Sequence, residues 1–399
     1  MKAIYFLFLV LLIGLGACNH QSMTFWDSPN AYLGQTLPSD TPKIFAPGLL
    51  AEKDALAGDR VAFSHDGKEF YYSHNTKWFD LTNVKTKYFK YENNKWNGPI
   101  TLNEHYYAPT FSPDGKVLYF IGGGAGEVMQ SNRTDSGWSK PVIFIKKSYG
   151  LYDFLPTASG NIYAGSNYGR GTVNDWSNYN ICSFKFTDTD TIIQNLGTPL
   201  NEPGFNGDFF ISKDESYIII SAKETKDFEC ELYISFRKTD NTWTNPKSLG
   251  KLINDGIAHR WGQYVTSDNK YLFYTRGNSE KNCFIYWVRF DKLLDSLKHT
   301  NFEPYLKTQI KDQRETAGHS FVYAIPDSAF IDDDGNNTLT YTASLDNGTS
   351  LPSWLSFNSK TVTFSGLPTT AGVIAIKVIA TDTAKAFVSG KFEIHVVEK

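Results

Sequence analysis

Residues 107–120, Tyr-Ala-Pro-Thr-Phe-Ser-Pro-Asp-Gly-Lys-Val-Leu-Tyr-Phe, decide the fold of this chain. The turn Pro113-Asp114-Gly115 divides them. Proline presets φ, aspartate bonds to its own backbone, and glycine adopts positive φ without steric cost. The β-branched, aliphatic and aromatic residues Val117–Phe120 suit a half-buried pleated strand. The stretch therefore predicts two antiparallel strands joined by a tight turn.

The same pattern returns along the chain. The hydroxyl residue that opens the turn stands at Ser64, Ser112, Thr157, Ser212 and Thr266, each about 50 residues after the one before it. Units of this length with several strands are typical of β-propeller blades, which stack around a channel to bury their faces. We predict an all-β protein with a five-bladed propeller over residues 46–298. A sixth blade built from the flanking segments stays open.

Composition limits the class of protein. The chain has 399 residues, a formal net charge of -3, 41% hydrophobic and 20% charged residues, which is ordinary for a folded globular protein. No basic block interrupts the sequence, so nucleic acid is excluded as a partner.

The N-terminus predicts export. A positive start is followed by an apolar run over Ile4–Ile13, too short to span a bilayer, and the run leads to Leu15-Gly16-Ala17-Cys18. This tetrapeptide resembles the bacterial lipobox, which implies acylation of Cys18 and a lipid anchor in the membrane. Asn19 after the cysteine favours the outer membrane, on the periplasmic face or at the cell surface. Residues 1–18 are thus expected to be a signal peptide and 19–45 a polar tether.

The turns Phe63-Ser64-His65-Asp66-Gly67 and Phe111-Ser112-Pro113-Asp114-Gly115 resemble the WD40-like (PD40) repeats of TolB-type propellers, with His65 where proline is usual. The end of the predicted propeller, Phe284–Lys298, resembles the last blade of such proteins among Bacteroidetes-type lipoproteins. The resemblance implies a propeller fold. It implies no shared catalytic motif, because these propellers serve interaction, catalysis and other roles.

After a polar linker over residues 299–316, short alternating strands separated by turns predict a second domain over 317–399, an antiparallel sandwich. The pieces Leu351–Phe357 and Phe364–Pro368 resemble a dystroglycan-type cadherin-like, Ig-like domain. This resemblance implies a spacer or adhesion module, and it implies calcium at Asp332, Asp334 and Asp382. A plain solvated turn at Asp333–Asn337 is the alternative.

A ligand site is expected at a channel mouth, built by residues at the start of each inner strand. The candidates for ligand binding are Arg60, Tyr107, Asp153, Asp208, Arg260 and Trp261. Aromatic faces stack on sugar rings, and arginine binds carboxylates through two parallel hydrogen bonds. The alternative is structural: acids and arginines that pair with each other and fix the register of the blades.

These residues predict a non-catalytic envelope lipoprotein that presents the propeller mouth to a glycan or a protein partner. An alternative from another class is a polysaccharide hydrolase or lyase that uses Asp59, Asp153 or Asp208, since paired carboxylates perform glycoside hydrolysis. A third is a TolB-like periplasmic scaffold for protein interactions. No cofactor is implied other than calcium in the C-terminal domain.

Overall fold

The computed structural model describes residues 24–51, 56–78, 80, 82–122, 126–169, 179–186, 191–201, 207–222 and 229–399. It is an all-β structure, as predicted, with one α-helix among the described residues, α1 (Asp291–His299). The predicted signal peptide with Cys18 lies outside the described residues. No helix within the described ranges is long and apolar enough to cross a membrane.

Five antiparallel sheets follow one another along the chain up to α1; four have four strands, and the second has a short fifth strand. The first contains β2 (Leu56–Phe63), β3 (Glu69–Asn75), β4 (Lys85–Glu92) and β5 (Lys95–Glu104). The second contains β6 (Tyr107–Phe111), β7 (Val117–Ile121), β8 (Glu127–Thr134) and β10 (Val142–Lys146), with β9 (Gly137–Trp138) beside β8. The third contains β11 (Leu151–Pro156), β12 (Ile162–Ser166), β13 (Asn180–Phe186) and β14 (Thr191–Asn195).

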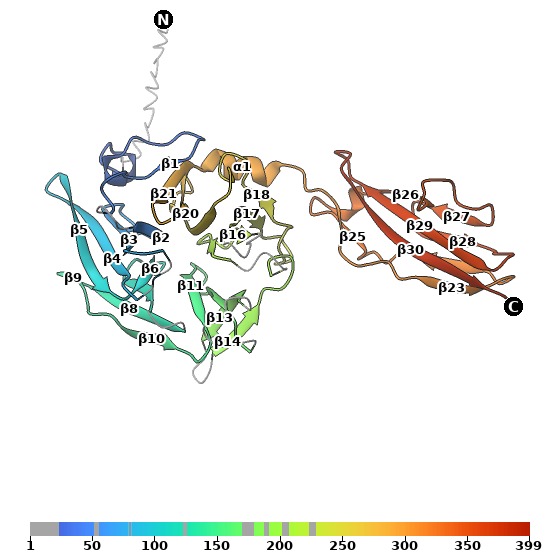
Figure 1. The fold of residues 1–399 in the computed structure, drawn as a ribbon, viewed down its shortest axis with the longest axis horizontal. Helices are drawn as coiled ribbons and strands as arrows, with labels where there is room; N and C mark the ends of the chain where they lie inside the picture. Colours follow the sequence, from blue (N-terminus) through green and yellow to red (C-terminus); the bar gives the residue numbers. More distant parts are fainter. Residues whose placement is uncertain are drawn as a thin grey trace, which may run out of the picture.

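The fourth sheet contains β15 (Phe209–Ile211), β16 (Tyr217–Ala222), β17 (Glu231–Phe236) and β18 (Lys247–Ser248). The fifth contains β19 (His259–Val265), β20 (Tyr271–Ser279), β21 (Asn282–Arg289) and a strand from the N-terminus, β1 (Lys43–Ile44). The first strands β2, β6, β11, β15 and β19 each contact the first strands of both neighbouring sheets. The sheets therefore surround a common centre, as Figure 1 shows.

The repeated turn is explained by two side-chain hydrogen bonds. Ser112 Oγ donates to Asp114 Oδ1 at 2.6 Å and accepts the backbone N–H of Val117 at 2.9 Å. Ser64 and Thr266 make the same pair of bonds in their own turns. The hydroxyl and the carboxylate thus satisfy backbone groups that the tight turn leaves unpaired.

The segment expected to be a free tether is folded over its described part. Residues 24–45 include two short 3-10 helices, η1 (Phe25–Asp27) and η2 (Tyr32–Gly34), and the strand β1. Tyr32 is 1% exposed and packs against Phe63, Tyr271 and Trp287. Because β1 pairs with β21, this segment completes the last sheet beside the first one. The prediction of a free tether was wrong because this polar stretch contains apolar residues, such as Tyr32 and Phe45, that are buried against the sheets.

The predicted linker also has structure. α1 ends at its first residue, His299. Within the linker, β22 (Tyr305–Leu306) pairs with β25 (Phe330–Ile331), and β23 (Gln313–Thr316) runs parallel to the last strand of the chain. The C-terminal domain therefore begins earlier than residue 317. Its larger sheet contains β23, β30 (Phe387–Val397), β29 (Gly372–Thr381) and β26 (Thr340–Leu345). Its smaller sheet contains β24 (Phe321–Ala324), β28 (Thr363–Gly366) and β27 (Leu355–Asn358), and a 3-10 helix, η4 (Asn336–Thr338), precedes β26.

One core joins the two C-terminal sheets. Phe364 from the smaller sheet meets Phe392 from the larger one with ring centroids 5.5 Å apart, and both are buried. The side chains of Cys182, Cys230 and Cys283 are buried.

Candidate functional site

The inner strands share an irregularity where they face the centre. The pairing register shifts after Gly58 in β2, Tyr107 in β6, Tyr152 in β11 and Trp261 in β19. The next residue in each strand has positive φ: Asp59, Ala108, Asp153 and Gly262. A side chain at Gly262 would collide with the backbone of Asp59 at 2.4 Å, so only glycine fits there. Bulges of this kind re-aim the side chains that follow them.

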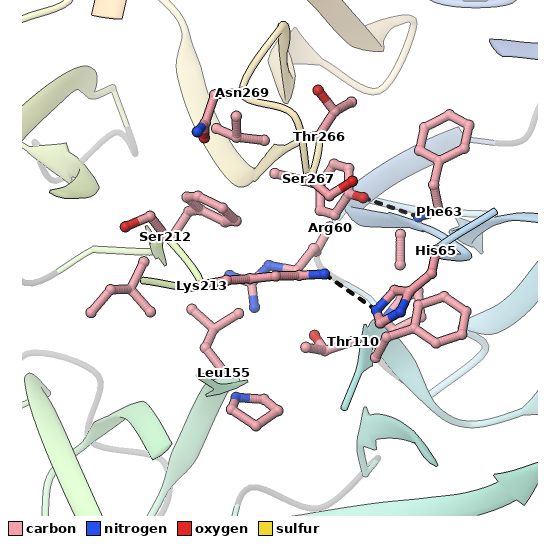
Figure 2. Close-up of a pocket in the computed structure, with 18 of the residues that line it drawn as sticks. Arg60, Phe63, His65, Thr110, Leu155, Ser212, Lys213, Thr266, Ser267 and Asn269 are labelled. Carbon is pink, nitrogen blue, oxygen red and sulfur yellow. Dashed lines mark hydrogen bonds between the residues drawn. The ribbon is translucent and has the colours of Figure 1, made fainter. Parts of the chain in front are cut away.

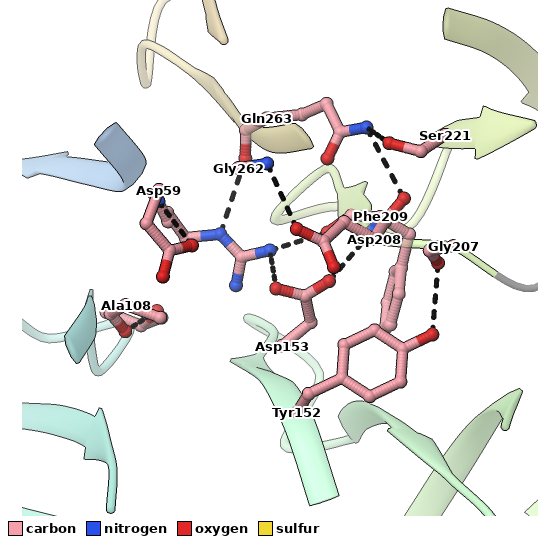
Figure 3. A network of polar contacts seen from close by, with 12 residues as sticks. Asp59, Ala108, Tyr152, Asp153, Gly207, Asp208, Phe209, Ser221, Gly262 and Gln263 are labelled. Atoms are coloured by element: carbon pink, nitrogen blue, oxygen red, sulfur yellow. Dashed lines mark hydrogen bonds and ion pairs between the residues drawn. The ribbon is translucent and has the colours of Figure 1, made fainter. Parts of the chain in front are cut away.

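Arg60 follows the bulge of β2 and lies at the centre of the ring. It is 1% exposed, and its Nη2 donates to Asp153 Oδ1 and to the carbonyl oxygen of Phe209, both at 2.6 Å. Its Nε donates to the carbonyl oxygen of Gln263 at 3.3 Å. The guanidinium therefore joins its own strand β2 to Asp153 of β11, Phe209 of β15 and Gln263 of β19, which are labelled in Figure 3. One arginine therefore ties four of the five sheets together.

The three predicted carboxylates gather around this arginine. Asp153 also accepts the backbone N–H of Phe209 at 2.8 Å. Asp59 accepts the N–H of Arg60 at 2.8 Å, and Asp208 accepts the N–H of Gly262 at 3.2 Å. Burial, and next the charge of Asp153, raises the pKa of Asp59 to about 6.

Tyr107 belongs to the same group. It is buried, and this burial raises the pKa of its hydroxyl, with further contributions from the charges of Asp59, Asp208 and Asp153. The sequence therefore located a real cluster, consisting of Arg60, Tyr107, Asp153 and Asp208 together with Asp59. Arg60, Tyr107 and Asp153 are buried, while Asp59 and Asp208 are half-buried. The cluster is therefore largely closed, unlike the open mouth that we expected.

Arg260 and Trp261 lie elsewhere. Arg260 is 1% exposed and donates to carbonyl oxygens of the segment 253–258, among them Ile253 at 2.9 Å and Ala258 at 3.2 Å. Trp261 stacks on Trp78 with ring centroids 6.3 Å apart, in a small separate cluster with Leu56 and Cys283. The donors of Arg260 are thus used by backbone carbonyl oxygens, whereas Trp261 lines a small pocket of about 70 Å³ together with Asp59. A role of these two residues in ligand binding stays a prediction.

The cavity lies at the other end of the inner strands, next to the repeated turns. It has a volume of about 240 Å³, and all five inner strands or the turns that follow them contribute to its wall. Figure 2 shows Phe63, Thr110, Leu155 and Ser212 around it, with Arg60 at its inner end. Arg60 thus belongs both to the buried network and to the cavity wall.

The cavity rim carries two basic side chains that the sequence analysis did not select. Lys213 Nζ lies 3.2 Å from His65 Nε2, and the two come from turns 148 residues apart. Burial lowers the pKa of Lys213, and burial and then the charge of Lys213 lower the pKa of His65. Figure 2 shows the lysine reaching across the opening to the imidazole. The only sequence signal was their shared place, directly after the hydroxyl residue of a repeated turn.

The acidic residues of the C-terminal domain have partners of their own. Asp334 accepts the N–H of Phe302 at 2.6 Å, and Asp382 accepts the side-chain amide of Asn301 at 2.8 Å. Asp332 Oδ1 accepts the N–H of Asp334 at 2.9 Å, while its buried Oδ2 has no partner among the described residues.

Calcium needs six to eight oxygen ligands. Among the described residues, the ligand atoms that lie within 4.8 Å of one another belong to a different, largely exposed trio, Asp312, Glu393 and His395. Asp332, Asp334 and Asp382 therefore do not fit one shared ion as they stand. Calcium at these residues stays a prediction.

Comparison with known proteins supports the C-terminal domain. Residues 303–397 match the family model described as "Putative Ig domain", so this part of the chain is an Ig-like domain. The match begins before the predicted boundary, in agreement with β22 and β23. No curated protein matches the chain significantly.

Several solved structures are similar to parts of the chain. TolB from Acinetobacter baumannii is 15% identical, with a TM-score of 0.35, over 61% of this chain and 56% of that one. A periplasmic gluconolactonase from Pseudomonas aeruginosa is 11% identical, with a TM-score of 0.33, over 56% and 68% of the two chains. A "putative alpha-galactosidase" from Bacteroides fragilis is 20% identical, with a TM-score of 0.20, over 24% of this chain and only 18% of its own length.

Proposed function

We propose that this protein is a lipid-anchored, non-catalytic binding protein of the cell envelope. In this proposal the five sheets are the blades of a five-bladed propeller, and the cavity beside the repeated turns binds a glycan. The observation that carries the proposal is the cavity itself, to which all five inner strands or their turns contribute. Concave sites with apolar walls and a few polar groups are where proteins usually bind ligands.

The wall of the cavity favours a sugar ring. Phe111 and Tyr264 offer aromatic surface, which stacks on the C–H faces of sugars. Thr110, Ser267 and Asn269 offer groups that form hydrogen bonds with hydroxyls. A protein partner would be recognised through a larger area than this cavity provides.

The enzyme alternative has weaker support. A glycosidase of the usual kind needs two carboxyl groups that face the substrate. Asp153 is 3% exposed and paired with Arg60, and neither Asp59, Asp153 nor Asp208 lines the 240 Å³ cavity. Asp153 and Asp208 bond to groups of other sheets instead, and Asp59 lines a separate pocket of about 70 Å³ without either of the other two carboxylates.

The test is affinity gel electrophoresis of residues 19–399 across plant, mucosal and bacterial polysaccharides, with product analysis of the same incubations. Ser267 is exposed and lines the cavity, so Ser267→Trp fills it without disturbing the core. We expect retarded migration by at least one polysaccharide, no new chain ends, and at least tenfold weaker binding in Ser267→Trp. The matched control is Ser136→Trp, in an exposed turn outside the cavity.

Other outcomes would select another function. Chain cleavage that is lost in Asp153→Ala would favour the hydrolase or lyase. No retardation and no products would favour the TolB-like scaffold, with a protein partner. Retardation that Ser267→Trp leaves unchanged would place the sugar site outside this cavity and overturn the proposal.

The anchor is proposed from the lipobox resemblance at Cys18, with the Ig-like domain as spacer. Its test is metabolic labelling of the full chain with a fatty acid. We expect label in the wild type and none in Cys18→Ser, together with loss of the protein from the outer-membrane fraction. A labelled Cys18→Ser variant would contradict the anchor.

A further inference from the structure

Two cationic side chains, Lys213 and Arg60, line the cavity. Lys213 has no ion pair with any described carboxylate, and its hydrogen-bond partner is the imidazole of His65. Asp214 also lines the cavity, but its carboxylate accepts the backbone N–H and the hydroxyl of Ser216 at 3.1 and 2.8 Å. An ammonium group without an acidic partner at a cavity rim attracts an anionic ligand.

Arg60 supplies a second donor at the inner end of the cavity. Its side chain is almost fully buried, and its Nη1 is without a hydrogen-bond partner among the described residues. A buried guanidinium N–H that lacks an acceptor costs free energy, and a ligand oxygen would remove this cost. Asp153 and the carbonyl oxygen of Phe209 both accept from Nη2, so Nη1 is the nitrogen of this guanidinium that lacks an acceptor.

We propose that the cavity recognises an acidic sugar, a residue whose carboxylate is bound by Lys213 and Arg60 while its ring lies against the aromatic wall. This inference rests on the proposed glycan-binding function and names the class of sugar. A carboxylate fits because both cations donate N–H bonds, and the planar guanidinium matches its geometry. In the free protein His65 holds Lys213 across the opening, and the ligand replaces this contact.

The experiment is saturation-transfer NMR and calorimetry on residues 19–399 with D-galacturonate and D-glucuronate, and with galactose and glucose as neutral counterparts. A third probe, N-acetyl-alanyl-alanine, carries a carboxylate without a sugar ring. We expect the acids to bind at least tenfold more tightly than the neutral sugars, and binding to weaken with salt. Lys213→Ala should weaken the binding of the acids about tenfold, and Lys213→Glu should abolish it.

The matched control is Lys116→Ala, because Lys116 is exposed in the equivalent turn of the second sheet and lies outside the cavity. Its affinity for the acids should equal that of the wild type. Lys213 lies in a surface turn outside the hydrophobic core, so its variants should fold, and their melting curves check this.

The outcomes separate the two proposals. Equal binding of acids and neutral sugars would overturn the inference and leave the glycan-binding function standing. If only the dipeptide binds, the ligand is a peptide carboxylate and the proposal of an acidic sugar is wrong. Unchanged affinity in Lys213→Glu would also overturn it. If no probe binds at millimolar concentration, the inference is wrong and the cavity does not bind a single sugar residue. The affinity gel with polysaccharides would still test the glycan-binding function separately.

Discussion

Glu215 shows at the scale of one residue how adjacent sheets are joined. It sits in the turn between β15 and β16, is 4% exposed, and accepts hydrogen bonds from Thr157 at 2.7 Å and Tyr163 at 2.7 Å in the third sheet. Ser159 and Arg237 also donate to it. Burial alone would raise the pKa of Glu215, but these hydrogen bonds outweigh it and lower the pKa to about 2.

We predict that Glu215→Gln destabilises the protein by about 2 kcal/mol at neutral pH, because charged hydrogen bonds are lost. The folded pKa lies below the ordinary value of 4.5, so the contribution is present above about pH 4.5 and lost as the pH falls towards 2. Urea unfolding between pH 3 and 7 measures the free energy of unfolding of the variant and the wild type. The difference between these two free energies should shrink at low pH. The control variant Glu303→Gln, at an exposed position, should leave the free energy of unfolding unchanged. If the difference in stability between Glu215→Gln and the wild type is the same at every pH, the lowered pKa of Glu215 is contradicted.

Asp59 gives the opposite pH dependence. Its folded pKa is raised to about 6, so the stability associated with its protonated form is present below about pH 4 and is lost as the pH rises through 6. Asp59→Asn should therefore raise the melting temperature by a few degrees at pH 8 and have little effect at pH 4. Thermal unfolding at both pH values tests this. A variant that is less stable at pH 8 would mean that the charged form is favourable.

At the scale of elements, the two-residue strand β1 has a large role because of what precedes it. It pairs with β21 and brings Tyr32 and Phe45 onto the aromatic core beside Trp287. A short strand adds few backbone hydrogen bonds, so the buried rings supply most of the binding energy of this segment.

We predict that Tyr32→Ala lowers the free energy of unfolding by about 3–4 kcal/mol, the usual cost of removing a buried large side chain. Leu37→Ala, at a side chain that is 54% exposed, should leave it unchanged. Denaturant unfolding followed by tryptophan fluorescence measures both. A chain that starts at Thr24 should fold, whereas one that starts at Gly48 should not. A folded, cooperative Gly48 chain would contradict the role of β1.

At the scale of the whole molecule, contacts from Asp333 join the ring of sheets to the Ig-like domain. Its carboxylate pairs with Lys238 Nζ at 3.0 Å and accepts the backbone N–H of Asn245 at 2.7 Å. Lys247 adds a contact of its Nζ with the ring of Phe302 at 3.1 Å. These contacts hold the second domain against the fourth sheet.

We predict that Asp333→Ala frees the Ig-like domain without unfolding either part. The radius of gyration from small-angle X-ray scattering should rise, while two thermal transitions remain. Asp327→Ala, at an exposed position in the same domain, is the control. An unchanged scattering curve would show that the remaining contacts suffice to fix the orientation.

The all-β class, the repeated turns and the approximate extent of the Ig-like domain could be predicted from the amino-acid sequence alone. These features depend on local interactions: the hydroxyl of Ser112 bonds to groups two and five residues away, and strand patterns repeat at every second residue. The cluster around Asp59, Asp153 and Asp208 was also predictable, because equivalent places in repeated units meet at the centre.

Only the tertiary structure decided which of these residues face a cavity. The bulges turn Arg60 inward, while Trp261, which precedes the bulge of β19, faces a separate cluster. Lys213 and His65 meet across the cavity opening from turns far apart in the chain, and Tyr32 packs on a sheet that is formed almost entirely from residues beyond 259. Such contacts depend on closure of the whole ring, and no local pattern in the sequence records them.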